Sequence, residues 1–298
     1  MRDSSYGPRL EPRLIRKAVA EDKEDGFEPG NCLPSSAHSP DDIASELLAI
    51  ADKHIGKGPL LNLIRRIFKE YRIVLFESAA SRTHHRSYQG GLLEHTSSVT
   101  KLTLKLYEHF CFEVPHLSPT ISKPLLVAGA ILHDVGKILD SQSTAAASQK
   151  TLAGNLIGHQ ILGLEIVERF AAEVQLDDET KYQLEHLILT HSRFPDWGSP
   201  FPPATLEAML LHYADYADST FVSALKTLDS DFATEDLTRR KGPFGTPLLK
   251  PRADRHVSQN HLSPDSLEES SSVNNQPPNP QVPNEYLKQR NNEQSKRH

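Results

Sequence analysis

The stretch PLLVAGAILHDVGK at Pro124–Lys137 decides the expected fold. From Leu125 to Leu132 it is apolar or small on every side of a helix, which is typical of a helix buried at the centre of a domain. The apolar run ends on a histidine and an aspartate, His133 and Asp134. Burying two such groups is costly unless they find a partner, and a metal ion would be such a partner.

Amphipathic segments flank this stretch on both sides. Their apolar residues recur at spacings of three and four, the period of a helix with one buried face. No segment shows the clean two-residue alternation of a strand. We therefore predict an all-α fold, a single helical bundle. The other helices are expected over residues 41–55, 59–68, 91–110, 155–173, 178–191 and 204–228.

The two ends of the chain differ from this core in composition. Residues 1–40 are rich in Pro, Gly, Ser and charged side chains, and residues 229–298 have few apolar residues. Segments of this kind cannot bury enough apolar surface to fold. We expect a disordered arm at 1–40, a helical domain at 41–228 and a disordered tail at 229–298.

Charge and cysteine content narrow the class of protein. Among 298 residues, 33 Lys and Arg stand against 39 Asp and Glu, a net charge of −6. This balance argues against a protein that coats nucleic acid through bulk charge, although a local basic groove remains compatible with it. The two cysteines, Cys32 and Cys111, form no Cys-x-x-Cys pair, which disfavours a thiolate zinc site and fits a reducing compartment. Without a long apolar run or a signal peptide, the chain is expected to be cytoplasmic, with no membrane partner.

Histidine is the unusual residue, with 15 copies, ten of them between residues 78 and 228. Several lie at the ends or on the inner faces of predicted helices. His95, His133, His159, His191 and Asp215 follow one another at intervals of 24 to 38 residues, each roughly one helix and a loop. Five helices could therefore bring these side chains to one metal centre, as helical bundles do.

The ordered motifs resemble the HD superfamily of metal-dependent phosphohydrolases, and most closely the HD domain of YhaM-type 3′→5′ exoribonucleases. The resemblance covers about Ser78 to Ser219. It implies hydrolysis of single-stranded RNA or DNA from the 3′ end with Mn²⁺-like metals. The matching segments are SAASRTHHRSYQGGLLEHT, LLVAGAILHDVGK, IGHQILGLEIVE, LEHLILTH and WGSPFPPATLEAMLLHYAD.

The resemblance also implies a ligand set. His95, His133, Asp134 and Asp215 would hold a first ion. His159 and His191 would serve a second ion, with Asp134 bridging the two.

The chain departs from the family in two ways. Members often carry a second histidine directly after the position of His191, where this chain has Ser192, so we expect the second ion to be weaker or completed by water. Members usually carry an N-terminal OB-fold, whereas about 40 residues and two predicted helices precede the motifs here. We expect short single strands to be preferred.

Other residues are candidates for contact with substrate. The resemblance places His84 and His85 near the substrate, and Arg86 is a candidate phosphate contact. Lys137 follows the His133-Asp134 pair by one helical turn and could meet a phosphate oxygen. With Asp134, it is the predicted catalytic pair.

Histidines and carboxylates without thiolates suit Mn²⁺, Co²⁺, Fe²⁺ or Ni²⁺, and one or two such ions would acidify a water for phosphoester hydrolysis. Two other functions stay open at this point: a phosphohydrolase or phosphodiesterase acting on nucleotides, and a non-catalytic metal-bearing module that binds a partner. The sequence does not decide the oligomeric state, and a homo-oligomer stays open.

Overall fold

A computed structural model gives the fold of the chain. It describes residues 2–4, 7–9, 16, 19–26, 35–36, 38–81, 86–143, 148–192, 199–232 and 234–251. The predicted substrate residues His84 and His85 lie outside the described residues, as does the chain from residue 252 onward.

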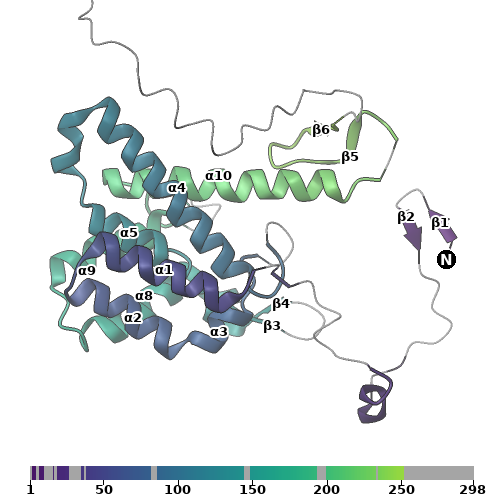
Figure 1. The fold of residues 1–298 in the computed structure, drawn as a ribbon, viewed down its shortest axis with the longest axis horizontal. Helices are drawn as coiled ribbons and strands as arrows, with labels where there is room; N and C mark the ends of the chain where they lie inside the picture. Colours follow the sequence, from purple (N-terminus) through teal and green to yellow (C-terminus); the bar gives the residue numbers. More distant parts are fainter. Residues whose placement is uncertain are drawn as a thin grey trace, which may run out of the picture. The chain divides into compact units, whose positions relative to one another are not determined.

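Helices build the domain, which confirms the all-α prediction (Figure 1). The long elements match the helices expected from apolar periodicity, and short ones are added between them. The helices are η1 Ala20–Lys23, α1 Pro40–Ile55, α2 Pro59–Glu70, α3 Arg72–Glu77, α4 Gly91–Glu113, η3 Pro115–Thr120, α5 Lys123–Leu132, α6 Lys137–Asp140, α7 Leu152–Leu156, α8 His159–Ala171, α9 Asp178–Thr190 and α10 Leu206–Asp229.

Strands occur only as three short antiparallel pairs among the described residues. The pairs are β1 Arg2–Ser4 with β2 Gly7–Arg9, β3 Ser141–Ser143 with β4 Ser148–Lys150, and β5 Leu237–Lys241 with β6 Pro247–Leu249.

One predicted helix is divided in the structure. The periodicity predicts a single helix over residues 155–173, but α7 ends at Leu156 and α8 begins at His159. Gly158 lies between them with φ +85, in the left-handed region that glycine adopts without strain. The break places His159 at the first position of a helix, where it can face the centre of the bundle.

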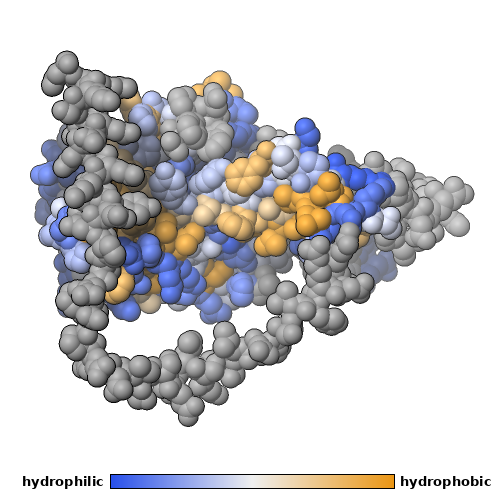
Figure 2. All heavy atoms as spheres, turned by 90° about the horizontal axis from the view of Figure 1, so that it is seen from above, coloured by the Kyte–Doolittle hydropathy of each residue, from blue (hydrophilic) through white to orange (hydrophobic). Residues whose placement is uncertain are grey.

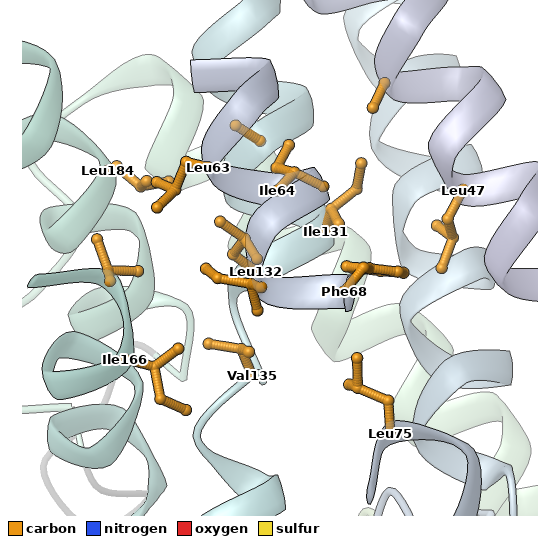
Figure 3. Close-up of a cluster of buried hydrophobic side chains, with 14 of the residues drawn as sticks. Leu47, Leu63, Ile64, Phe68, Leu75, Ile131, Leu132, Val135, Ile166 and Leu184 are labelled. Carbon is orange, nitrogen blue, oxygen red and sulfur yellow. The ribbon is translucent and has the colours of Figure 1, made fainter. Parts of the chain in front are cut away.

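The helix α5 is the central element, as its composition predicts. All eight residues from Leu125 to Leu132 are buried, and α5 contacts α1, α2, α4, α9 and α10. Figure 3 shows its last turn surrounded by side chains of the neighbouring helices. The labelled residues are Leu47, Leu63, Ile64, Phe68, Leu75, Ile131, Leu132, Val135, Ile166 and Leu184. This packing fixes the end of α5, the point where His133 and Asp134 follow.

The β5–β6 hairpin lies within the stretch that composition assigns to a disordered tail. Leu237 pairs with Leu249 and Lys241 with Pro247, and both strands contact α10. The turn depends on Gly245, which has φ +74. Composition alone misses this hairpin because its order comes from a turn and polar contacts, not from an apolar core.

The surface combines polar and apolar areas, as Figure 2 shows for one face. Along α10, the large apolar side chains of Met209, Tyr213, Phe221 and Leu225 are exposed. Among the described helices, none is both long and apolar enough to cross a membrane.

Candidate metal centre

Five helices bring the predicted ligands together. His95 lies in α4 and Asp215 in α10, while His159 is the first residue of α8. His133 and His191 directly follow the last residues of α5 and α9. Each side chain therefore projects from an end or an inner face of a helix packed around α5.

A first group of ligand atoms surrounds one carboxylate oxygen, Asp134 Oδ2. His95 Nε2 lies 3.3 Å from it and His133 Nε2 lies 3.4 Å from it. The two imidazole nitrogens are 3.3 Å apart. Asp215 Oδ1 lies 3.1 Å from His95 Nε2, which brings a second carboxylate to the group.

A second group surrounds the other oxygen of the same carboxylate. Asp134 Oδ1 lies 3.4 Å from His159 Nε2 and 3.6 Å from His191 Nε2. These two nitrogens are 3.5 Å apart. One carboxylate thus joins two groups of ligand atoms, one through each oxygen.

The spacing of these atoms fits divalent metal ions. Ligands about 2.1 Å from an ion, at angles of about 90–110°, lie about 3.0–3.4 Å from one another. Both groups meet this spacing closely enough to be sets of potential ligands, His95–His133–Asp134 and Asp134–His159–His191. In addition, Asp134 Oδ1 is buried and accepts no hydrogen bond from any described residue. Such an unpaired oxygen is costly, and an ion would satisfy it. The residues present therefore fit a divalent metal.

Hydrogen bonds at the far side of the imidazoles orient them. His133 Nδ1 lies 2.8 Å from the carbonyl oxygen of Ala130, and His191 Nδ1 lies 2.7 Å from that of Ile188. A carbonyl can only accept, so Nδ1 donates and Nε2 keeps its lone pair. Ligand histidines are commonly fixed in this way. Both rings thus present Nε2 to the centre.

His95 is held by a carboxylate that the sequence analysis did not select, Asp218. Asp218 Oδ2 lies 2.8 Å from His95 Nδ1, and Ser98 Oγ donates to Asp218 Oδ1 at 2.5 Å. In the sequence, Asp218 is marked by its place three residues after Asp215, on the same helical face of α10.

Arg86 belongs to this supporting network in the structure. Its guanidinium donates to Asp218 and lies 3.7 Å from Glu94, and its side chain is largely buried. It lines a second cavity of about 570 Å³, with His38 and Lys101, and not the cavity beside the ligands. The contact of Arg86 with a phosphate, expected from sequence, stays a prediction.

Burial and charge shift the pKa values of histidines in opposite directions in the two groups of ligand atoms. Burial lowers the pKa of His95, but the carboxylates of Asp134, Asp215 and Asp218 outweigh it and raise that pKa to about 10. Burial lowers the pKa of His159 to about 3 and that of His191 to about 4. His159 and His191 are therefore neutral near pH 7, with lone pairs free for an ion.

The pKa of Asp134 reflects burial against the effect of neighbouring side chains. Burial raises it, but Lys137 and His133 outweigh burial and hold this pKa well below the usual range. Lys137 Nζ lies 2.5 Å from Asp134 Oδ2. The carboxylate is therefore ionised, as a metal ligand must be.

The close approach of two backbone segments depends on Gly136. A Cβ at this position would lie 1.9 Å from the carbonyl oxygen of His159 and 2.4 Å from the backbone nitrogen of Gly163. Only glycine allows α8 to lie against the turn that carries Asp134. The VGK part of the motif thus brings His159 within reach of Asp134.

A cavity of about 650 Å³ opens beside the second group of ligands. Asp134, Lys137, His159, His191 and Asp215 line one end of it. Ser192 also lines the cavity, and Gln160 Nε2 donates to its hydroxyl at 3.4 Å. The centre therefore faces a space large enough for a nucleotide-sized ligand.

His212 of α10 contacts the backbone of His191. Its Nδ1 lies 2.7 Å from the carbonyl oxygen of His191. Because His191 directly follows the last residue of α9, this contact connects α10 to the end of α9.

Comparison with known proteins agrees with this geometry. Residues 92–220 match the family model of the HD domain. The 3′-5′ exoribonuclease YhaM of Listeria welshimeri is 31% identical over 212 residues, which cover 71% of this chain and 64% of that protein. The YhaM proteins of Bacillus licheniformis and Bacillus subtilis are 35% and 34% identical over 164 residues, 55% of this chain and 49% of each relative.

The chain thus spans between about half and 64% of the length of these relatives. No solved structure matches the chain.

Proposed function

We propose that the protein is a metal-dependent phosphodiester hydrolase that shortens single-stranded nucleic acid from its 3′ end. The match of residues 92–220 to the HD domain and the similarity to YhaM-type exoribonucleases support this proposal. One observation carries this proposal: the two oxygens of Asp134 face two different groups of histidine ligands. A carboxylate in that position is suited to bridge two ions that act on one phosphate.

For the metal we propose Mn²⁺ before Co²⁺, Fe²⁺ or Ni²⁺. Four imidazoles and two carboxylates make a mixed nitrogen and oxygen set, which suits first-row transition ions better than Mg²⁺. His95, His133, Asp134 and Asp215 would hold one ion, and Asp134, His159 and His191 the other. When bound, such ions supply charge neutralisation and a water of lowered pKa.

The protein's own residues would position the phosphate. Lys137 lies at the junction of the centre and the cavity, with its side chain 18% exposed and 2.5 Å from Asp134. From there its ammonium group can reach a phosphate oxygen and stabilise developing negative charge. The cavity wall keeps the substrate next to the ligands, while the burial of Asp134 excludes bulk water from the shared carboxylate. His84 and His85 stay candidates for substrate contact.

Direction and product are proposed from the relatives, whose names describe 3′-5′ exoribonucleases. We propose nucleoside monophosphates as products and short single strands as substrates. The cavity size supports the latter, because about 650 Å³ holds a few nucleotides and not a folded RNA.

The test is a labelled RNA oligonucleotide assayed with Mn²⁺ beside single-stranded DNA, nucleoside triphosphates and cyclic nucleotides. The proposal expects a ladder that shortens from the 3′ end with release of monophosphates. Release from free nucleotides only would replace the nuclease with a nucleotide phosphohydrolase. Metal binding without hydrolysis of any substrate would identify a non-catalytic module.

A further inference from the structure

The cavity beside the metal centre extends along α10, beyond the ligand residues. Its lining there consists of hydroxyl side chains at helical spacing. Residues three and four apart share one face of a helix, so these hydroxyls form a row. The row comprises Ser219, Thr220, Ser223, Thr227 and, at the end of the helix, Ser230.

Cationic side chains of β5 and α10 add positive charge to the cavity. Arg240 and Lys241 of β5 line the cavity, together with Lys226 of α10. Both β5 side chains are exposed, and neither forms an ion pair with a carboxylate in the described part of the chain. The acidic residues of the lining are Asp134 and Asp215, both in the proposed metal centre. The groove is therefore basic, although the whole chain has a net charge of −6.

The hairpin that carries these cations is held in place from outside the groove. Arg239 donates its backbone N–H to Asp231 Oδ2 at 2.6 Å, and Lys250 Nζ lies 2.5 Å from Asp231 Oδ1. Thr238 Oγ1 accepts from the backbone N–H of Leu248 at 2.9 Å. Asp231, just after α10, thus contacts both sides of the hairpin. These contacts hold in place the part of the cavity wall that contains Arg240 and Lys241.

We propose that this α10–hairpin groove binds the phosphate backbone of a single-stranded oligonucleotide whose 3′ end lies at the metal centre. The inference rests on the proposed function and adds the path of the strand and the residues that hold it. Hydroxyl groups and cations contact phosphates without reading bases, so binding along the groove is independent of sequence.

The length of the groove sets the length of strand it can hold. The lining runs from Asp215 to Ser230, roughly 22 Å along a helix that rises about 1.5 Å per residue. At about 3.4 Å per stacked nucleotide, the backbone of up to about six nucleotides can lie along this length. Affinity is expected to rise with length up to about that size and then to level off.

The experiment measures binding in the absence of hydrolysis. Full-length protein in EDTA is titrated against fluorescently labelled single-stranded oligonucleotides of two to twelve nucleotides, with anisotropy as the readout. The variant R240Q/K241Q is compared with wild type. The control K53Q/K105Q removes two exposed lysines of α1 and α4 that lie outside the groove.

Loss of two phosphate contacts is expected to weaken binding of the longest strand by about ten-fold or more at low salt. It should also reduce the slope of log K against log salt by about 1.4, since each neutralised phosphate contributes about 0.7 for a single strand. The control should bind as wild type does. A Mn²⁺ titration of R240Q/K241Q that matches wild type shows that the variant is folded.

Three results would overturn the proposed binding in the groove. They are wild-type affinity that does not depend on oligonucleotide length, equal affinity of R240Q/K241Q and wild type, or an equal loss of affinity in the control K53Q/K105Q. Hydrolysis of bis(4-nitrophenyl) phosphate by the Mn²⁺-loaded wild type is measured separately. That small diester does not need the groove, so its hydrolysis tests the proposed function on its own.

Discussion

The two halves of the metal centre share one carboxylate but differ in their surroundings. The closed half, His95, His133 and Asp215 around Asp134 Oδ2, has two fully buried imidazoles and a second carboxylate. The open half, His159 and His191 around Asp134 Oδ1, has no second carboxylate among the described residues, and the side chain of His159 is 19% exposed. Charge and burial thus favour tight binding of an ion in the closed half, while the open half faces the cavity.

The contacts that orient the histidines also differ between the closed half and the open half. In the closed half, Asp218, Ser98 and Arg86 form a charged network behind His95. In the open half, the contact at Nδ1 of His191 among the described residues is with a backbone carbonyl. A carboxylate behind an imidazole makes it a stronger ligand, so the difference predicts two metal affinities and not one.

Removal of the shared carboxylate has the largest expected effect. Asp134→Ala takes a ligand from both halves and leaves the imidazoles without the anion that offsets two cations. We expect metal content to fall to near zero and hydrolysis to fall by at least about a thousand-fold. Elemental analysis and the oligonucleotide assay measure the two effects. The control Asp52→Ala alters an exposed carboxylate of α1; full activity of Asp134→Ala would contradict the assignment.

Variants of single histidines should separate the halves. His159→Ala is expected to remove the weaker ion and keep the tighter one, whereas His95→Ala should weaken the tighter ion. The physical reason is the unequal number of carboxylates around Oδ1 and Oδ2. Mn²⁺ titration by calorimetry distinguishes one remaining site from two. Loss of the same Mn²⁺ site in both variants would contradict the difference between the two halves.

The network behind His95 predicts a smaller effect on the same titration. Asp218→Asn keeps the shape of the side chain but removes the charge that strengthens His95 as a ligand. We expect the tighter ion to bind about 10–100-fold more weakly, with the weaker ion unchanged. Partial recovery in Asp218→Glu would show that the charge matters; equal Mn²⁺ affinities for Asp218→Asn and wild type would assign Asp218 a packing role only.

The smallest expected effect is on the stability of the metal-free protein. The pKa values of about 3 for His159 and about 4 for His191 lie below the unfolded value of about 6.5. The unfolded state therefore binds more protons between pH 5 and 6.5, and the free energy of unfolding falls as pH is lowered through this range. His95, with a pKa of about 10, acts in the opposite sense, and its contribution is lost as pH rises from about 6.5 through 10.

Urea unfolding in EDTA between pH 5 and 9 measures both contributions. A maximum of stability near pH 6.5 is expected for the wild type. In His159→Gln the decrease on the acidic side should become shallower, because one of the two titrating histidines is gone. A free energy of unfolding that does not change between pH 5 and 6.5 would contradict the neutral, buried state of the open half.

The sequence predicts the central helix for a physical reason. A wholly apolar segment such as Leu125–Leu132 has only one stable environment, the middle of a bundle, and the residues that end it must lie inside too. The spacing of His95, His159, His191 and Asp215 by one helix and a loop then limits the ways in which they can meet. The structure places all of these side chains around Asp134.

Features that depend on individual contacts were not predictable in this way. The role of Asp218 depends on the angle between α4 and α10, which no periodicity encodes. The break before His159 depends on the conformation of one glycine, and the β5–β6 hairpin depends on polar contacts of Asp231. Arg86 could be recognised as a cation from sequence, but its hydrogen-bond partner Asp218 comes from a distant part of the chain.

The central claim is that Asp134 bridges two ions, one in each half. Metal-free protein titrated with Mn²⁺ and followed by electron paramagnetic resonance tests it most directly, because two Mn²⁺ ions joined by a carboxylate couple magnetically. We expect an isolated six-line signal at the first equivalent, from the closed half, and its replacement by a coupled spectrum at the second. Two equivalents bound with only isolated signals, or saturation at one equivalent, would contradict the bridge.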